Sequence, residues 1–209
     1  QLWAAMDHWE GQHFGWKPGN YLSPVTKVVL DPRAGYSLTL SLTEKIPALV
    51  PPKDTPWVKR VKIRSAKLSE FWGRPMYIGA TLLLPRDYDK HPEARYPAIY
   101  FQGHFSLQPP CGFSPEPVEE NAASLARRDA RGIENGHEFY QAWASDDFPR
   151  AVAVTFQHPT PFFDDSYAVN SANNGPCQDA LVEELIPYLE KNFRLVPQGF
   201  ARGLTGGST

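Results

Sequence analysis

The pattern of apolar and polar positions changes near residue 56. Before that point, Leu38, Leu40 and Leu42 alternate with polar residues in YSLTLSLTEKI, and TKVVL is a second short apolar run. Strict alternation is typical of a half-buried β-strand, and the intervening DPRAG has the composition of a turn. PALVPPKDTP then has the composition of a proline-rich linker. We therefore expect residues 1–56 to form a small β-rich accessory segment followed by a linker.

A candidate hairpin opens the second part of the chain. VKRVKIRSAKL alternates at Val61 and Ile63, and MYIGATLLLP is a second strand-like segment. FWGRP, which lies between them, has the composition of a hairpin connection. The two segments predict an antiparallel pair of strands.

Two more strongly apolar segments follow. YPAIYFQGH and AVAVTFQ lack alternation, which is typical of strands that are buried on both faces. The polar stretch between them, residues 118–145, permits helices. After the second strand, QDALVEELIPYLEKNF has the helical period, with a Pro187 that we expect to kink it. The apolar face of that helix is predicted to be Val182, Ile186, Leu189 and Phe193.

The order of strand, helix, strand and helix predicts βαβ crossovers. Such units form a mostly parallel sheet with helices on both faces, and FARGLTGGST would be the next parallel strand. We expect the strand near Ile99 to lie beside the strand near Val154, with the segment near Leu204 as the next neighbour. Residues 57–209 are therefore predicted to be an α/β domain.

The composition of the chain indicates which kinds of partner it does not bind. The 209 residues include 21 basic and 23 acidic side chains, with a net charge of -2 and both signs interspersed. We therefore expect no basic surface of the kind that binds nucleic acid. The longest apolar runs are far shorter than the roughly 20 residues that cross a bilayer, so no membrane span is expected. His8, Glu10 and His13 match no metal-binding spacing, and we expect no metal site.

The cysteines leave two alternatives open. The chain has two, Cys111 in PPCG and Cys177 in GPCQ, and each follows a proline in a loop-like stretch. They are too few for a disulfide framework, so one bridge and two free thiols both fit. Because each lies in a loop that follows a strand ending at the same predicted sheet edge, we expect the two to approach each other.

The last residues carry the candidate chemistry. Gly206, Gly207, Ser208 and Thr209 match the first four positions of the G-x-S-x-G turn. Glycines are needed there because the turn from strand to helix is so tight that side chains would collide. A glycine-rich loop without catalytic function has a similar composition. The position after a predicted parallel strand favours a nucleophile, because α/β folds place catalytic groups at that edge.

These segments together resemble the esterase D-like family of α/β hydrolases, which includes feruloyl esterases, enterochelin esterases, S-formylglutathione hydrolases and antigen 85 acyltransferases. The resemblance rests on RYPAIYFQGHF, FDDSYAVNSANNGPCQDALVEELIPYLEKNFR and RGLTGGST. It covers about residues 57–209, and residues 1–56 more loosely resemble the accessory β region of some secreted members. The resemblance implies an α/β-hydrolase domain, incomplete at its C-terminus, that cleaves carboxylic esters through an acyl-enzyme without a cofactor.

The resemblance also implies roles for individual residues. Ser208 would be the nucleophile, and the backbone amides of His104 and Thr209 would bind the oxyanion. Where many relatives have His-Gly or Asp-Gly after the third strand, this chain has Gln102-Gly103. In this fold the acid and the histidine follow the serine, so we expect both after Thr209. The residues expected to line the site are Gln102, Phe105 and His158.

Three functional hypotheses remain at this stage. The first is a secreted or periplasmic serine esterase that acts on a small-molecule or polysaccharide-linked ester. The second is a cytosolic S-formylglutathione hydrolase, which would be cytoplasmic. The third is a noncatalytic carbohydrate-associated or interaction module with a remnant of the serine turn. Gln1 is expected to be a processed or trimmed start, so the lack of a signal peptide does not favour the cytoplasm. The sequence predicts neither the ester nor the oligomeric state.

Overall fold

The chain forms two compact units. The computed structural model describes residues 5–6, 19–29, 31–35, 37–48, 52–103, 106–117, 119–131, 134–161 and 165–206. Unit 1 comprises Gln1–Lys53 and Pro159–Asp165, and unit 2 comprises Asp54–His158 and Ser166–Thr209. The grouping of residues 159–165 with the N-terminal unit was not predicted from the sequence. The interpretation of residues 1–56 as an accessory segment stays a prediction.

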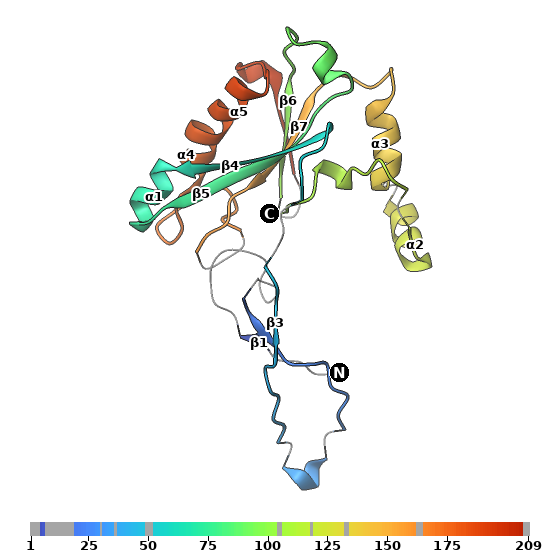
Figure 1. Ribbon diagram of the computed structural model, residues 1–209, viewed down its shortest axis with the longest axis vertical. Coiled ribbons are helices and arrows are strands. Elements are labelled where there is room, and N and C mark those ends of the chain that lie inside the picture. The colour runs from blue at the N-terminus through green and yellow to red at the C-terminus, as the bar shows by residue number, and fades with distance from the viewer. Residues whose placement is uncertain are drawn as a thin grey trace. The chain divides into compact units, whose positions relative to one another are not determined.

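Unit 2 is built around a five-stranded sheet with the order β10-β6-β7-β5-β4 (Figure 1). Its strands are β4 (Val58–Ser65), β5 (Met76–Leu83), β6 (Ala98–Gln102), β7 (Val152–Gln157) and β10 (Arg202–Gly206). β6 pairs in parallel with β7 and β10, whereas β5 pairs antiparallel with β4 and β7. The sheet is therefore mixed: β6, β7 and β10 are parallel to one another, and the predicted antiparallel pair of β4 and β5 extends it on the β7 side.

The predicted strand neighbours are confirmed. Ile99 of β6 is opposite Ala153 of β7, and Leu204 of β10 is opposite Tyr100 of β6. β4 and β5 form the predicted antiparallel pair. The mixed sheet with flanking helices confirms the α/β class.

Helices cover both faces of this sheet. The described α-helices of unit 2 are α1 (Ala66–Trp72), α2 (Ala122–Arg131), α3 (Gly136–Ala144), α4 (Cys177–Ala180) and α5 (Ile186–Asn192), with a π-helical segment, Leu181–Leu185, between α4 and α5. Tyr100 and Val154 pack on one face with Leu185 of the π-helical segment. Ala153 packs on the other face with Trp143 of α3. Figure 1 shows α4 and α5 on one side of the sheet and α3 on the other.

The connection between β4 and β5 is a helix, so the prediction of a short hairpin connection is wrong. The side-chain oxygen of Ser65 accepts a hydrogen bond from the amide of Leu68 at 3.1 Å, which caps α1. Gly73 ends the helix with a φ of 62°, a left-handed conformation that suits glycine. The alternation that predicts β4 therefore stops at Ser65, and the following AKL belongs to α1.

The helix after β7 contains a π-helical turn that shifts its buried face. The buried positions include Cys177, Leu181, Leu185 and Leu189. Of the predicted face, Leu189 is buried and Ile186 and Phe193 pack against the core, whereas Val182 is 54% exposed. A spacing of four residues exceeds the α-helical repeat of 3.6, so these positions would drift around a regular helix. The wider π turn offsets that drift, and it ends directly before the α5 turn that contains Pro187.

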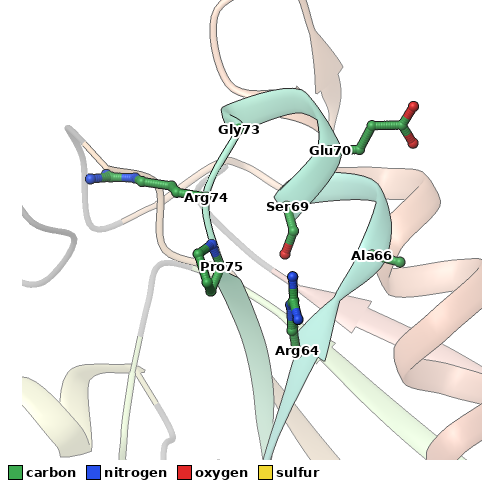
Figure 2. Close-up of a pocket in the computed structure, with 7 residues that line it drawn as sticks. All are labelled: Arg64, Ala66, Ser69, Glu70, Gly73, Arg74 and Pro75. Atoms are coloured by element: carbon green, nitrogen blue, oxygen red, sulfur yellow. The ribbon is translucent and has the colours of Figure 1, made fainter.

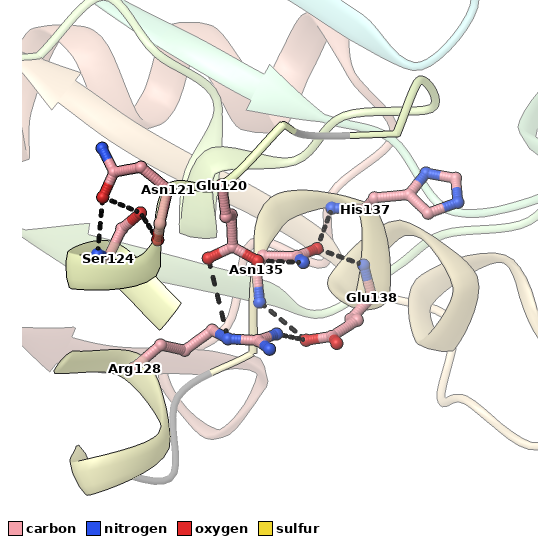
Figure 3. A network of polar contacts seen from close by, with 7 residues as sticks. All are labelled: Glu120, Asn121, Ser124, Arg128, Asn135, His137 and Glu138. Carbon is pink, nitrogen blue, oxygen red and sulfur yellow. Dashed lines mark hydrogen bonds and ion pairs between the residues drawn. The ribbon is translucent and has the colours of Figure 1, made fainter. Parts of the chain in front are cut away.

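A polar network joins α2 to α3 (Figure 3). The side chain of Asn135 accepts hydrogen bonds from the amides of His137 and Glu138, and Glu138 accepts one from the amide of Asn135. This reciprocal pair is a capping box at the start of α3. Arg128 of α2 forms ion pairs with Glu138 at 2.6 Å and with Glu120 at 3.7 Å. The network ties the N-terminus of α3 to the preceding helix.

Unit 1 contains less regular structure than the sequence pattern predicted. Among the residues of unit 1 that the structure describes, the strands are β1 (Ala5–Met6), β2 (Tyr21–Leu22) and β3 (Glu44–Lys45), each of two residues. Residues 37–43 are not in a strand, so the prediction from the alternating leucines is wrong there. β3 pairs with β2 over only two residues, and alternation alone forms no strand without a partner. DPRAG does form a turn, with a 3-10 helix at Pro32–Ala34.

Candidate functional site

The carboxyl ends of the parallel strands β10 and β6 meet at one edge of the sheet. Gly206, the last residue of β10, is opposite Gln102, the last residue of β6. A Cβ atom at position 206 would lie 2.4 Å from the carbonyl oxygen of Gln102. Only glycine fits this close approach without a shift of the backbone. The predicted glycine requirement at position 206 therefore has a steric cause.

A cavity of about 380 Å³ opens at this edge. It lies where the β6 and β10 ends meet the segment that follows β6, and its size is within the range of small-molecule sites. Polar groups that face it come from β6, β7, β10 and the loop after β6. The lining residues are Phe101, Gln102, Gly103, Ser106, Gln108, Pro109, Pro110, Cys111, Gly112, Thr155, Thr205 and Gly206.

The side chain of Gln102 borders this cavity and carries a hydrogen-bond donor that no described residue satisfies. Its Nε2 atom is buried and, within the described part of the chain, has no hydrogen-bond partner. A buried amide without a partner costs free energy, about 1–3 kcal/mol. A bound molecule with an acceptor at this position would remove that cost.

Gln157, at the end of β7, supports the loop after β6. Its Nε2 atom donates hydrogen bonds to Oγ1 of Thr81 at 2.8 Å and to the carbonyl oxygen of Ser106 at 3.4 Å. Ser106 lines the cavity, so Gln157 holds one wall of the site in place from the neighbouring strand.

His158, which the sequence predicts to line the site, is enclosed in unit 2. Its side chain is 1% exposed, and its Nδ1 atom accepts a hydrogen bond from the amide of Ser166 at 3.3 Å. The Ser166 hydroxyl lies 3.0 Å from the same nitrogen. His158 is not among the residues that line the cavity at the strand ends. The observed contacts therefore fix the chain after residue 165 to the end of β7.

Five predicted site residues lie outside the described residues: His104, Phe105, Gly207, Ser208 and Thr209. Their roles as oxyanion donors, lining residue, turn glycine and nucleophile stay predictions. Gly103, directly before His104, lines the cavity. Within the described part of the chain, no atom lies within 4 Å of a Cβ atom placed at Gly103.

The predicted approach of the two cysteines is wrong in this structure, because both thiols are free. Cys111 is exposed in the 3-10 turn Pro110–Gly112, next to Phe113 of the cluster that packs against α3. Cys177 is buried in the cluster on the other face, with Tyr100. The sheet therefore lies between the two thiols.

The apolar side of the β10 end forms a second cavity, of about 330 Å³. Gln102 borders it as well, together with Leu204, which is 76% exposed. Burial, together with the nearby Glu190 carboxylate, raises the pKa of Tyr100 in its wall to about 12, against a smaller opposing effect of Arg202. That phenol is therefore protonated at neutral pH and does not supply a base.

Neither a metal site nor a membrane-spanning helix is found among the described residues. Its histidine, cysteine and acidic side chains form no group of three that would hold a metal ion. None of its helices is long and apolar enough to cross a membrane.

Several cavity residues were missed by the sequence interpretation. Ser106, Gln108, Thr155 and Thr205 were not expected in the site, although all four line the cavity. Thr155 lies two positions before the end of β7, and Thr205 lies one position before the end of β10. Their closeness to the ends of parallel strands could have predicted that they line the site. No local signal indicates that the loop after β6 turns back over the edge.

Two solved structures of esterases are similar to part of this chain. No family model matches it, and no curated protein matches it. One similar solved structure is a ferulic acid esterase with 17% sequence identity and a TM-score of 0.43, aligned over 72% of this chain and 50% of that chain. Another is a CE1 ferulic acid esterase from Anaeromyces mucronatus in complex with ferulic acid, with 17% identity and a TM-score of 0.38, over 76% of this chain and 52% of that chain. The chain thus spans about half the length of these two proteins.

Proposed function

We propose that this chain carries the nucleophile of a serine carboxylic ester hydrolase with an α/β-hydrolase fold. One observation carries the proposal: the ends of two adjacent parallel strands are aligned at Gly206 and Gln102, and a cavity opens beside them. Ser208 follows Gly206 by two positions, and His104 follows Gln102 by two positions. This register supports a serine and a backbone donor that act on the same reacting group.

The proposed reaction is acyl transfer to Ser208. The Ser208 hydroxyl attacks the ester carbonyl carbon and gives its proton to a histidine, and the oxyanion accepts hydrogen bonds from the amides of His104 and Thr209. The alcohol leaves with the proton, and water then hydrolyses the acyl-enzyme. Each oxyanion donor contributes about 3 kcal/mol in comparable enzymes. The histidine and its acid are assigned to residues outside the described part of the chain.

Gln102 is assigned a substrate-binding role in this reaction. Its buried Nε2 atom lacks a partner in the described part of the chain, and the residue borders the cavity at the strand ends. An ester oxygen or a hydroxyl group of the substrate would accept a hydrogen bond from it. The substrate class that fits is a small-molecule or polysaccharide-linked ester.

Ester hydrolysis by the full-length protein tests this proposal. We expect turnover of p-nitrophenyl esters or methyl hydroxycinnamates, and a loss of at least about 1000-fold in kcat for Ser208→Ala, since removing a triad serine leaves little beyond the oxyanion effect. Ser41→Ala is the matched control, because Ser41 is an exposed serine of unit 1. Hydrolysis that survives in Ser208→Ala, or a wild-type protein without activity on any ester of the panel, would contradict the proposal.

A further inference from the structure

A hollow flanked by two arginines lies at the turn that joins β4, α1 and β5 (Figure 2). Its volume is about 670 Å³, within the range of ligand sites. The residues that line it are Arg64, Ala66, Ser69, Glu70, Gly73, Arg74 and Pro75.

The two guanidinium groups of this hollow have no partner in the described part of the chain. Arg64 and Arg74 are exposed, and neither side chain forms a hydrogen bond or ion pair there. Other arginines of unit 2 are engaged: Arg194 donates to the carbonyl oxygen of Tyr88 at 2.8 Å, and Arg202 donates to Glu190 at 2.7 Å. The positive charge at the hollow is therefore available to a ligand.

The frame that carries these arginines is fixed by internal hydrogen bonds. The Ser69 hydroxyl donates to the carbonyl oxygen of Ser65 and accepts from the amide of Met76 at 2.9 Å. These bonds tie α1 to the end of β4 and to the start of β5. Glu70 is the one acid of the lining, and Figure 2 shows its carboxylate directed away from Arg64.

The hollow lies at the same edge of the sheet as the proposed ester site. β5 is antiparallel to β7, so the start of β5 and the end of β4 lie at the carboxyl end of β7. In the sheet order, β6 and β4 are three strands apart, which corresponds to about 14 Å. Lys62 of β4 lies two residues before Arg64, and its ammonium group is 5.0 Å from the centroid of the Tyr77 ring. It adds a positive charge to the strand that carries Arg64.

We propose that this hollow binds a carboxylate of the substrate, at a distance from the ester that is cleaved. Guanidinium groups bind carboxylates through two parallel hydrogen bonds, and weak hydration makes arginine well suited to this task. The substrate class is therefore an ester on an acidic oligosaccharide or a similar carboxylate-bearing chain. The assignment of this carboxylate to the ester substrate rests on the proposed esterase function. Binding of a carboxylate in the hollow does not require Ser208.

Calorimetric titration of the full-length Ser208→Ala protein tests the site without turnover. The probes are tri-galacturonate, neutral xylotriose and inorganic phosphate. We expect tri-galacturonate to bind and its Kd to rise at least about tenfold, which corresponds to about 1.4 kcal/mol, in Arg64→Gln or Arg74→Gln, because a hydrogen bond between charged groups is lost. Arg64→Lys keeps the charge but loses the paired geometry, so it should fall between wild type and Arg64→Gln.

The matched control is Lys191→Gln, which removes one exposed positive charge near the C-terminal end of α5. We expect it to leave the Kd of tri-galacturonate unchanged. Equal binding by all variants, equal binding of xylotriose, phosphate affinity as high as that of the trisaccharide, or no binding at all would overturn the inference. Every protein in this titration carries Ser208→Ala, so the experiment measures binding and not hydrolysis. Its result can therefore be distinguished from a failure of the esterase proposal. Unchanged thermal unfolding of each arginine variant verifies that the fold is intact.

Discussion

At the scale of single residues, the two thiols differ in their access to solvent. Burial raises the pKa of both Cys111 and Cys177, which lowers the reactive thiolate fraction of each at neutral pH. A hydrogen bond from Ser166 partly offsets this effect at Cys177. Cys111 is nevertheless exposed, whereas Cys177 is 2% exposed.

We therefore expect iodoacetamide to modify Cys111 slowly and Cys177 only on unfolding. The measurement is the intact mass over time, with and without a reductant, in native buffer and in urea. The rate for Cys111 should increase with pH, because the thiolate is the reacting form. A protein that takes up no label in urea until a reductant is added would contain the disulfide that this structure lacks.

The side-chain donor of Gln102 is expected to contribute to substrate binding and not to stability. Gln102→Met keeps the approximate length of the side chain but removes the donor, so substrate binding should weaken while the protein becomes no less stable. We expect kcat/KM of the full-length esterase to fall about 2- to 10-fold, as for the loss of one neutral hydrogen bond, with no decrease in the free energy of unfolding. Kinetics and urea unfolding measure the two effects. A large loss of stability with unchanged kcat/KM would instead show that the Gln102 amide has a structural role.

At the scale of elements, the π-helical segment supports α1 through Glu184. Its carboxylate accepts hydrogen bonds from the Ser65 hydroxyl at 2.5 Å and from the Lys67 amide at 3.0 Å. Both bonds satisfy groups at the N-terminus of α1, where a negative charge is favourable. We expect Glu184→Ala to lower the free energy of unfolding by about 2 kcal/mol.

The neighbouring Glu183 provides the matched control for that measurement. It forms an ion pair with Lys67 at 2.7 Å, and its side chain is 57% exposed. An exposed pair of this kind contributes about 0–1 kcal/mol, so Glu183→Ala should have a small effect on urea unfolding. Equal effects of the two variants would show that the Glu184 hydrogen bonds add no stability.

The polar network between α2 and α3 predicts a dependence on pH. Hydrogen bonding from Arg128, and then from the Asn135 amide, lowers the pKa of Glu138 below its usual 4.5 (Figure 3). A lowered pKa in the folded state contributes stability above the unfolded pKa, and that stability is lost as the pH falls through the folded pKa. Glu138→Gln should therefore be less stable than wild type at neutral pH, and the difference should shrink below pH 4.5. Urea unfolding across this range measures it, and a constant difference would contradict the assignment.

At the scale of the whole molecule, the sequence predicted the strand neighbours of the sheet better than its connections. β6 and β7 are buried on both faces, so their continuous apolar runs were a direct signal. The helical connection after β4 was missed because α1 has only seven residues, too few to show a clear helical period. The buried face of the helix after β7 was misjudged because a π turn leaves no clear mark in a hydrophobic period.

The candidate site was predictable only where a local rule applied. Gly206 follows from the need for close backbone approach at the strand end, and the structure provides the 2.4 Å contact that requires it. The separation of Cys111 from Cys177 depends on which face of the sheet each following segment covers, and no local pattern encodes that. The cavity walls at Ser106 and Gln108 depend on the path of a loop, for the same reason.

The most direct test of the central claim is covalent labelling of the full-length protein with a fluorophosphonate, followed by mass mapping of its peptides. An activated serine forms a phosphonyl ester with this reagent, whereas an ordinary surface serine does not react. The account predicts one label, on the peptide that contains Ser208, and no label in Ser208→Ala. A label on a different residue, or a wild-type protein that stays unlabelled while it hydrolyses esters, would contradict it.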